Sequence, residues 1–135
     1  MPLVEGCLKR VEMIRTMPEL REKLWHNVNR LQQGLKDRGF DIGNTNSPVT
    51  PIYMKGDVPE ATQMVMDLRE NYHIFCSIVV YPVIPKGDII YRLIPTAAHS
   101  DKDIDETLAA FEAVKKKLDT GLYKAADIPD MAEKM

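Results

Sequence analysis

The chain has 135 residues, of which 44% are hydrophobic and 28% are charged, and its formal net charge is −2. This length and this balance are typical of one soluble globular domain with a hydrophobic core. Basic and acidic residues are mixed along the chain without a basic patch, which argues against a nucleic-acid partner. The sequence has no run of about 18 apolar residues and therefore predicts no membrane span, and its N-terminus has no signal-peptide pattern.

The two cysteines, Cys7 and Cys76, lie in apolar contexts. Neither is part of a CxxC motif or of a Cys/His spacing typical of redox or metal sites. We therefore expect two buried thiols and a cytoplasmic protein, because the cytoplasm keeps thiols reduced. A disulfide or a nucleophilic cysteine is the alternative.

Apolar residues at helical spacing predict two helices in the first third of the chain. The first spans residues 4–16 and begins without a capping residue, which indicates that it was cut from a longer element. Pro18 opens the second helix, since its missing N–H is not needed in the first turn, and Gly39 ends it in a left-handed conformation. The apolar face of this helix comprises Leu20, Leu24, Val28, Leu31 and Leu35.

Two strands are predicted next, a brief one at residues 40–42 and a longer one at 50–54. Pro48 and Pro51 place the longer strand at a sheet edge or give it an irregular start, because proline donates no hydrogen bond to a neighbouring strand.

A third helix, two further strands and a last helix complete the pattern. Asp57 introduces the third helix, and residues 74–81 are apolar at nearly every position, which is typical of a central strand covered on both faces. A strand at 89–94 follows after a short loop, so the pair is expected to be antiparallel. Ser100 opens a capping box for the last helix, and residues from 120 onward are expected to form a loose tail. The order predicts an α+β fold with helices against a small sheet.

Arg92 is the residue that its surroundings explain least. In a strand over 89–94 its side chain shares a face with Ile90 and Ile94. A guanidinium between two isoleucines needs an anionic partner, and its donors match a carboxylate or a phosphate. Two interpretations stay open: an internal salt bridge or snorkelling side chain, and an anchor for an anionic ligand, with the loop at 82–87 as one wall of the site.

The remaining polar residues predict no catalytic centre. His99 precedes the helix cap and is expected to brace the turn, and the three histidines lack the spacing of a metal site. The sequence has no glycine-rich phosphate loop, no Gly-x-Ser-x-Gly elbow and no carboxylate pair for acid/base work. Its lysines lie on helix faces, in turns and in the tail, so none is expected to be a desolvated, reactive amine.

Two neighbouring segments carry a further pattern. Residues 81–87 are Tyr-Pro-Val-Ile-Pro-Lys-Gly, and residues 91–99 are Tyr-Arg-Leu-Ile-Pro-Thr-Ala-Ala-His. Together they resemble the C-terminal signature of the α-oxoamine synthases, in which a proline loop ending in glycine precedes a strand with an arginine and a small-residue stretch ending in histidine. Other segments resemble the long helix and following strand of that family, namely Pro18–Arg21, Leu24–Trp25, Gly39–Asp41 and Ser47–Pro51.

The resemblance implies the small C-terminal domain, with a mostly antiparallel sheet, of a fold-type I pyridoxal-phosphate enzyme. Such enzymes are normally homodimers that condense an amino acid with an acyl-CoA thioester. It also implies that the Schiff-base lysine lies in a missing central domain, so this chain is expected to bind no pyridoxal phosphate (PLP) and to be inactive alone. Arg92 matches the arginine that holds the substrate carboxylate, and His99 ends the same motif. Val83 replaces a threonine that lies near the substrate in several members, which leaves the acyl donor open.

On this basis the chain divides into three parts: a helix at 1–17 that continues from the missing domain, a C-terminal α+β domain at 18–120, and a polar tail at 121–135. The substrate-binding candidates are Arg92, Val83 and His99. Expected partners are the missing N-terminal and central domain, a second subunit, and the amino-acid and acyl-CoA substrates. Two rival hypotheses are a stand-alone module that binds a small carboxylate and a dimerisation domain with Arg92 in an internal ion pair.

Overall fold

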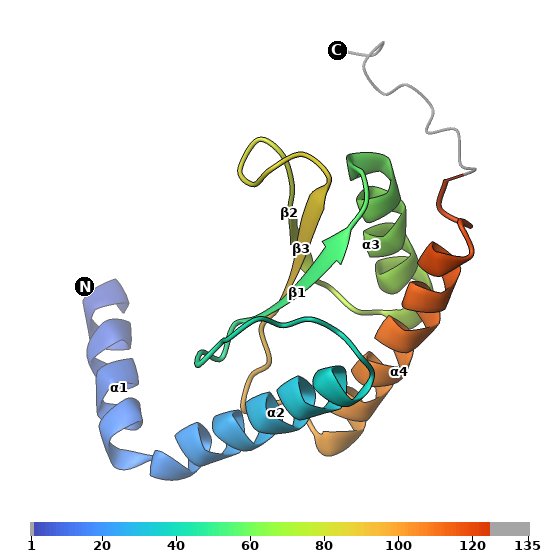
Figure 1. Ribbon diagram of the computed structural model, residues 1–135. Coiled ribbons are helices and arrows are strands. Elements are labelled where there is room, and N and C mark those ends of the chain that lie inside the picture. Colours follow the sequence, from blue (N-terminus) through green and yellow to red (C-terminus); the bar gives the residue numbers. More distant parts are fainter. Residues whose placement is uncertain (1, 125–135) are drawn as a thin grey trace.

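The computed structural model describes residues 2–124, which fold into four helices and three strands (Figure 1). In chain order these are α1 (Pro2–Thr16), α2 (Pro18–Asp37), β1 (Thr50–Lys55), α3 (Val58–Tyr72), β2 (Ser77–Val79), β3 (Asp88–Leu93) and α4 (Asp101–Asp119). Helices α2, α3 and α4 pack on one side of the sheet, and α1 projects away from it (Figure 1). The predicted α+β class is confirmed. None of the helices in residues 2–124 is both long enough and apolar enough to cross a bilayer.

The sheet is antiparallel throughout, with the strand order β1-β3-β2. The predicted antiparallel pairing of the last two strands is therefore confirmed. The edge position of the strand that contains Pro51 is also confirmed, because β1 has β3 on only one side. The brief strand predicted at 40–42 is reduced to one isolated bridge between Asp41 and Tyr53.

The prediction of a central strand at 74–81 is wrong. Only Ser77–Val79 form a strand, this strand lies at an edge, and β3 occupies the centre. Ile78 packs against the core, whereas its neighbours Ser77 and Val79 point to the opposite face of the sheet, since side chains alternate along a strand. No helix of residues 17–124 covers that opposite face (Figure 1), which we call the open face. The apolar run therefore matches a strand with two covered faces, but residues 2–124 cover only one.

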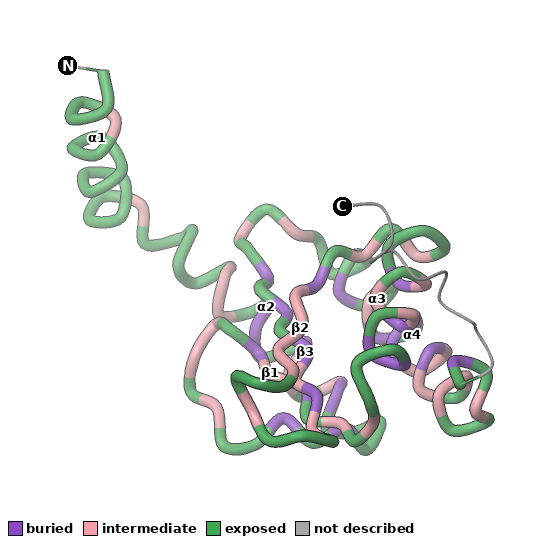
Figure 2. Tube along the Cα trace, turned by 90° about the horizontal axis from the view of Figure 1, so that it is seen from above, coloured by how far each residue is buried: buried purple, intermediate pink, exposed green. Residues whose placement is uncertain are grey.

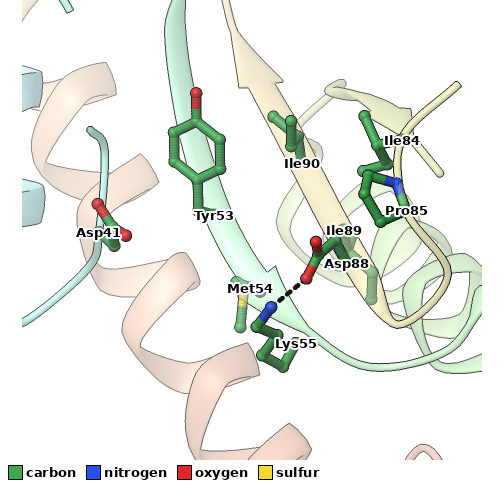
Figure 3. Close-up of a pocket in the computed structure, with 9 residues that line it drawn as sticks. All are labelled: Asp41, Tyr53, Met54, Lys55, Ile84, Pro85, Asp88, Ile89 and Ile90. Atoms are coloured by element: carbon green, nitrogen blue, oxygen red, sulfur yellow. Dashed lines mark hydrogen bonds and ion pairs between the residues drawn. The ribbon is translucent and has the colours of Figure 1, made fainter. Parts of the chain in front are cut away.

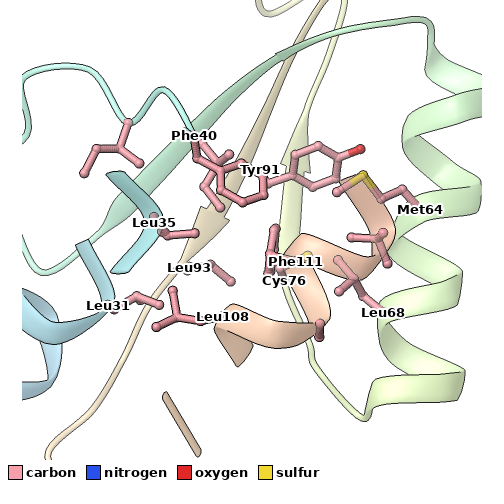
Figure 4. Packing of buried hydrophobic residues seen from close by; sticks show 14 of the residues in the cluster. Leu31, Leu35, Phe40, Met64, Leu68, Cys76, Tyr91, Leu93, Leu108 and Phe111 are labelled. Carbon is pink, nitrogen blue, oxygen red and sulfur yellow. The ribbon is translucent and has the colours of Figure 1, made fainter. Parts of the chain in front are cut away.

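The hydrophobic core lies between the sheet and the three packed helices, with Phe111 of α4 at its centre (Figure 4). The Phe111 side chain is fully buried. Its ring makes edge-to-face contacts with Phe40 and Tyr91, at centroid separations of 6.1 and 6.4 Å. The core thus joins the end of α2, the central strand and the last helix.

Local sequence signals set the ends of the helices as predicted. Asp57 and Glu60 form a reciprocal capping box at the start of α3, and Ser100 and Asp103 form another at the start of α4. Gly39 follows α2 with a φ of 72°, a left-handed conformation that glycine adopts without steric cost.

Helix α1 makes almost no contribution to the core. It has no buried residue (Figure 2), and the exposed fractions of Leu8 and Ile14 are 66% and 71%. The expectation of two buried thiols is wrong for one of them: Cys7 on α1 is exposed, whereas Cys76 is buried. Burial raises the pKa of the Cys76 thiol to about 11, which keeps it protonated and unreactive at neutral pH.

The segment after α4 is fastened to α3 through Asp67. The Asp67 carboxylate accepts hydrogen bonds from Lys117 Nζ at 2.7 Å, Tyr123 OH at 2.6 Å and Asn71 Nδ2 at 2.6 Å. Tyr123 is buried in the core cluster, so the first residues after α4 pack against the domain. The rest of the predicted tail, residues 125–135, lies outside the described residues.

We predict that Asp67→Asn lowers the free energy of unfolding of the chain by about 2 kcal/mol at pH 7, because three donors, one of them charged, lose their ionised acceptor. Partial burial raises the pKa of Asp67, but hydrogen bonds from Lys117, Tyr123 and Asn71 outweigh this, and the net pKa is lowered from 3.8. The carboxylate therefore stabilises the fold fully above pH 3.8, and this contribution is lost as the pH falls through the lowered folded-state value. Urea unfolding of both proteins at a series of pH values measures this dependence.

The matched control is Asp119→Asn, which changes an exposed carboxylate at the end of α4. We expect this control to stay within about 0.5 kcal/mol of the parent chain. A stability gap between Asp67→Asn and the parent that persists unchanged well below pH 3 contradicts an ionic role for Asp67.

Candidate functional site

Arg92 lies on the open face of the central strand. Its neighbours in β3, Tyr91 and Leu93, are buried against the helices, and the alternation of the strand therefore turns Arg92 to the other side, where it is exposed. Ile90 shares this face, as predicted. Ile94 lies just past the end of the strand, and its exposed fraction is 60%.

Two strands flank Arg92 with very different side chains. The residue opposite it on β1 is Pro51, which has no polar side-chain atom, and the residue opposite it on β2 is Ser77. Arg92 Nε donates a hydrogen bond to Ser77 Oγ at 3.1 Å. Within residues 2–124 this is the one side-chain hydrogen bond of Arg92, and no carboxylate lies within 4.0 Å of the guanidinium. The described residues thus provide no internal salt bridge for Arg92, and the outer nitrogens of its side chain remain available.

The open face is hollowed beside Arg92's strand, toward the Lys55 end of the sheet (Figure 3). The hollow has a volume of about 430 Å³. Tyr53 and Ile90 stand on its sheet side, and Ile84 and Pro85 of the proline loop lie on the far side. An exposed ion pair between Lys55 and Asp88 lies at the lower end of the hollow in this view. The lining is mainly apolar, and therefore suits a hydrocarbon better than a second anion.

Val83 lies in the turn that begins the proline loop after β2. Its exposed fraction is 78%, and its backbone N–H donates to the carbonyl of Val80 at 3.0 Å. The structure brings Val83 into no hydrogen bond with Arg92 or His99. Ile84 and Pro85 of the same loop line the hollow on the open face, but Arg92 does not, so a wall of the Arg92 site formed by this loop stays a prediction.

His99 braces the turn between β3 and α4. Its Nδ1 accepts the backbone N–H of Thr96 at 2.9 Å, so the neutral ring carries its proton on Nε2. Asn27 of α2 donates from Nδ2 to the carbonyls of Thr96 and His99, both at 2.9 Å. His99 also lines a second hollow, of about 570 Å³, together with Leu93 and Ile94. The turn is thus fixed from both sides. His99 lines this second hollow, whereas Arg92 lines neither of the two.

Sequence reasoning missed two residues of this region. Ser77 becomes visible as a partner of Arg92 only when the register of β2 and β3 is known. Asn27 is fully buried, and its Oδ1 has no hydrogen-bond partner among the described residues. The only sequence signal for Asn27 was an amide within the apolar face of α2, one residue before Val28.

The described residues do not fit PLP. The cofactor requires a lysine amine that forms the Schiff base, and a desolvated lysine is the type that reacts readily. Among residues 2–124 no lysine is buried. The least exposed of those in ion pairs, Lys117, is held by Asp67 at 2.7 Å and has a raised pKa because of that hydrogen bond. No chemical step at the cofactor is therefore assigned to this part of the chain.

Comparisons with known proteins match the chain to part of several PLP-dependent acyltransferases. No protein-family model matches the chain. The chain is 66% identical over 122 residues to the cysteate-C-fatty acyltransferase of Capnocytophaga ochracea, a match covering 90% of this chain and 29% of the relative. It is 38% identical to the 8-amino-7-oxononanoate synthase of Symbiobacterium thermophilum, over 84% of this chain and 28% of that protein.

A solved structure also matches the fold of this chain. Serine palmitoyltransferase with PLP superposes with a TM-score of 0.74 at 25% identity, covering 82% of this chain and 28% of that one. The chain thus spans less than a third of the length of the relatives it matches. It matches the C-terminal part of the α-oxoamine synthase family, as the resemblance implied.

Proposed function

We propose that this chain is the substrate-carboxylate-binding C-terminal domain of a PLP-dependent acyl-CoA:amino acid C-acyltransferase. One observation carries the proposal: Arg92 is exposed on the open face, and its outer nitrogens have no partner within residues 2–124. An exposed guanidinium whose outer nitrogens are free can bind an anion that comes from outside residues 2–124. The carboxylate of an amino acid has the two oxygens that a guanidinium binds in parallel.

The division of work follows from what the chain contains. The domain binds and orients the amino acid, and the cofactor, held by the remainder of the enzyme, supplies the means to stabilise a carbanion. Holding the substrate at its carboxylate restricts its rotation and places the α-carbon for reaction. The chain alone is expected to be inactive, and the complete enzyme is expected to act as a cytoplasmic homodimer.

The proposed substrates come from the relative with 66% identity, whose name specifies cysteate and a fatty acyl group. Cysteate carries a carboxylate and a sulfonate on one small molecule, and Arg92 is assigned to the carboxylate that all the amino-acid substrates share. The mainly apolar hollow on the open face lies next to the same strand and suits part of a fatty acyl chain.

The test is an assay of the complete reading frame that encodes this chain. The purified protein is given L-cysteate, L-serine, L-alanine or glycine with palmitoyl-CoA, and thiol release and cofactor absorbance are followed. We expect the highest kcat/KM with cysteate and no turnover by the 135-residue chain alone. A reading frame that encodes no lysine-bearing cofactor domain upstream of Met1 refutes the proposal in favour of a stand-alone carboxylate-binding module. Turnover by the isolated chain refutes it as well.

A further inference from the structure

The contact between Ser77 and Arg92 has a direction that matters for binding. The two residues are paired across β2 and β3, 15 residues apart in sequence, and the Ser77 hydroxyl accepts from Nε at 3.1 Å. A guanidinium has five N–H donors: one on Nε and four on the two outer nitrogens. With Nε engaged, the outer pair is the edge that remains for a carboxylate, and the approach along the Nε side is closed.

Among residues 2–124, Ser77 is the single side chain that forms a hydrogen bond with Arg92. On the other flank, Pro51 of β1 has no polar side-chain atom. The described residues also provide no ion pair for Arg92. An exposed arginine without such a contact samples many rotamers, and this freedom is lost when a ligand binds.

From this geometry we infer that Ser77 is a positioning residue that holds Arg92 with its outer nitrogens turned outward to receive the substrate carboxylate end-on. The inference rests on the proposed function of Arg92 as the carboxylate anchor. Ser77 itself does not touch the substrate. Its hydroxyl orders the guanidinium before binding, so its loss weakens binding of the amino acid and leaves the later chemical steps unchanged.

The test compares Ser77→Ala with Ser77→Thr in the full-length enzyme. We expect Ser77→Ala to raise the KM for the amino acid about 5-fold with kcat nearly unchanged, as for the loss of one hydrogen bond. Ser77→Thr keeps the hydroxyl and, on a strand, is expected to restore most of the affinity. The matched control is Thr62→Ala, which removes an exposed hydroxyl on α3 whose one hydrogen bond within residues 2–124 is to the carbonyl of Val58.

A second measurement separates orientation of Arg92 from a general effect on the sheet. In the isotope-labelled 135-residue chain, the {¹H}–¹⁵N NOE of Arg92 Nε reports the mobility of the guanidinium. We expect Ser77→Ala to lower this NOE to that of a free arginine side chain, and Ser77→Thr and Thr62→Ala to preserve it.

The outcomes distinguish the positioning role of Ser77 from the proposed role of Arg92 as the carboxylate anchor. If Ser77→Ala leaves both the KM and the NOE unchanged while Arg92→Ala raises the KM, the inference about Ser77 is overturned and the proposed function stands. If neither variant changes the KM, the anchor role of Arg92 fails and the role of Ser77 fails with it. A fall in the NOE without any change in KM also overturns the inference, because the ordering would then have no effect on binding.

Discussion

Full-length enzyme with Arg92→Ala is expected to require about 100-fold more amino acid for half-maximal rate. Two parallel hydrogen bonds to a carboxylate are lost together with the charge, which corresponds to about 3 kcal/mol of binding free energy. The effect is expected in KM for the amino acid and not in KM for the acyl-CoA, since the carboxylate belongs to the first substrate. Steady-state kinetics with each substrate varied in turn measures both values.

One further variant and a control show whether the shape of the guanidinium matters for binding. Arg92→Lys keeps the charge but not the paired donors, so an intermediate loss of affinity is expected. The control is Arg69→Ala on α3, whose arginine is exposed and pairs with its neighbour Glu70. Because Arg92 is exposed, its variants are expected to unfold at the temperature of the parent protein. Unchanged amino-acid affinity in Arg92→Ala removes the anchor role.

Phe111→Ala is expected to lower the free energy of unfolding by about 4 kcal/mol, the loss typical of truncating a fully buried phenylalanine. The ring is 0% exposed, and it contacts the rings of Phe40 and Tyr91 edge-on. Its removal therefore leaves a cavity where α4, β3 and the end of α2 meet. A loss of this size approaches the total free energy of unfolding of a domain. The variant is therefore expected to be largely unfolded at 37 °C, as measured by circular dichroism.

Phe75→Ala is the matched control for this experiment. The same atoms are deleted, but the exposed fraction of Phe75 is 83%. We expect a change within about 0.5 kcal/mol. A similar loss of stability in both variants contradicts the core that is centred on Phe111.

The helices were predicted well because their signals are local. The acidic or hydroxyl residues that cap α3 and α4, such as Asp57 and Ser100, lie within three residues of the groups they bond. The strand containing Arg92 was also predictable, because β-branched residues on both sides of Arg92 indicate a strand. The order of the strands was not predictable in this way. Whether residues 74–81 or β3 is central depends on β1, which lies more than 30 residues before β3 in the sequence.

In the candidate site, too, local sequence predicts one residue but not its partners. Arg92 was identified from its own strand, since alternation places a charge beside isoleucines. Its partner Ser77 depends on pairing across the proline loop, and the bonds of Asn27 to Thr96 and His99 span 69 and 72 residues. No window of local sequence contains both ends of such contacts. Such contacts between residues that are distant in the sequence are set by the folded structure as a whole.

Helix α1 has one consequence for the behaviour of the molecule in solution. An isolated helix of 15 residues is marginal in water, and this one gains no burial from the domain that follows. Its amide hydrogens are therefore not protected by the cooperative unfolding that protects those of β3 and α4. The order of α1 then depends on whatever surface covers Leu8 and Ile14, so hydrogen exchange in this segment reports whether the domain is docked.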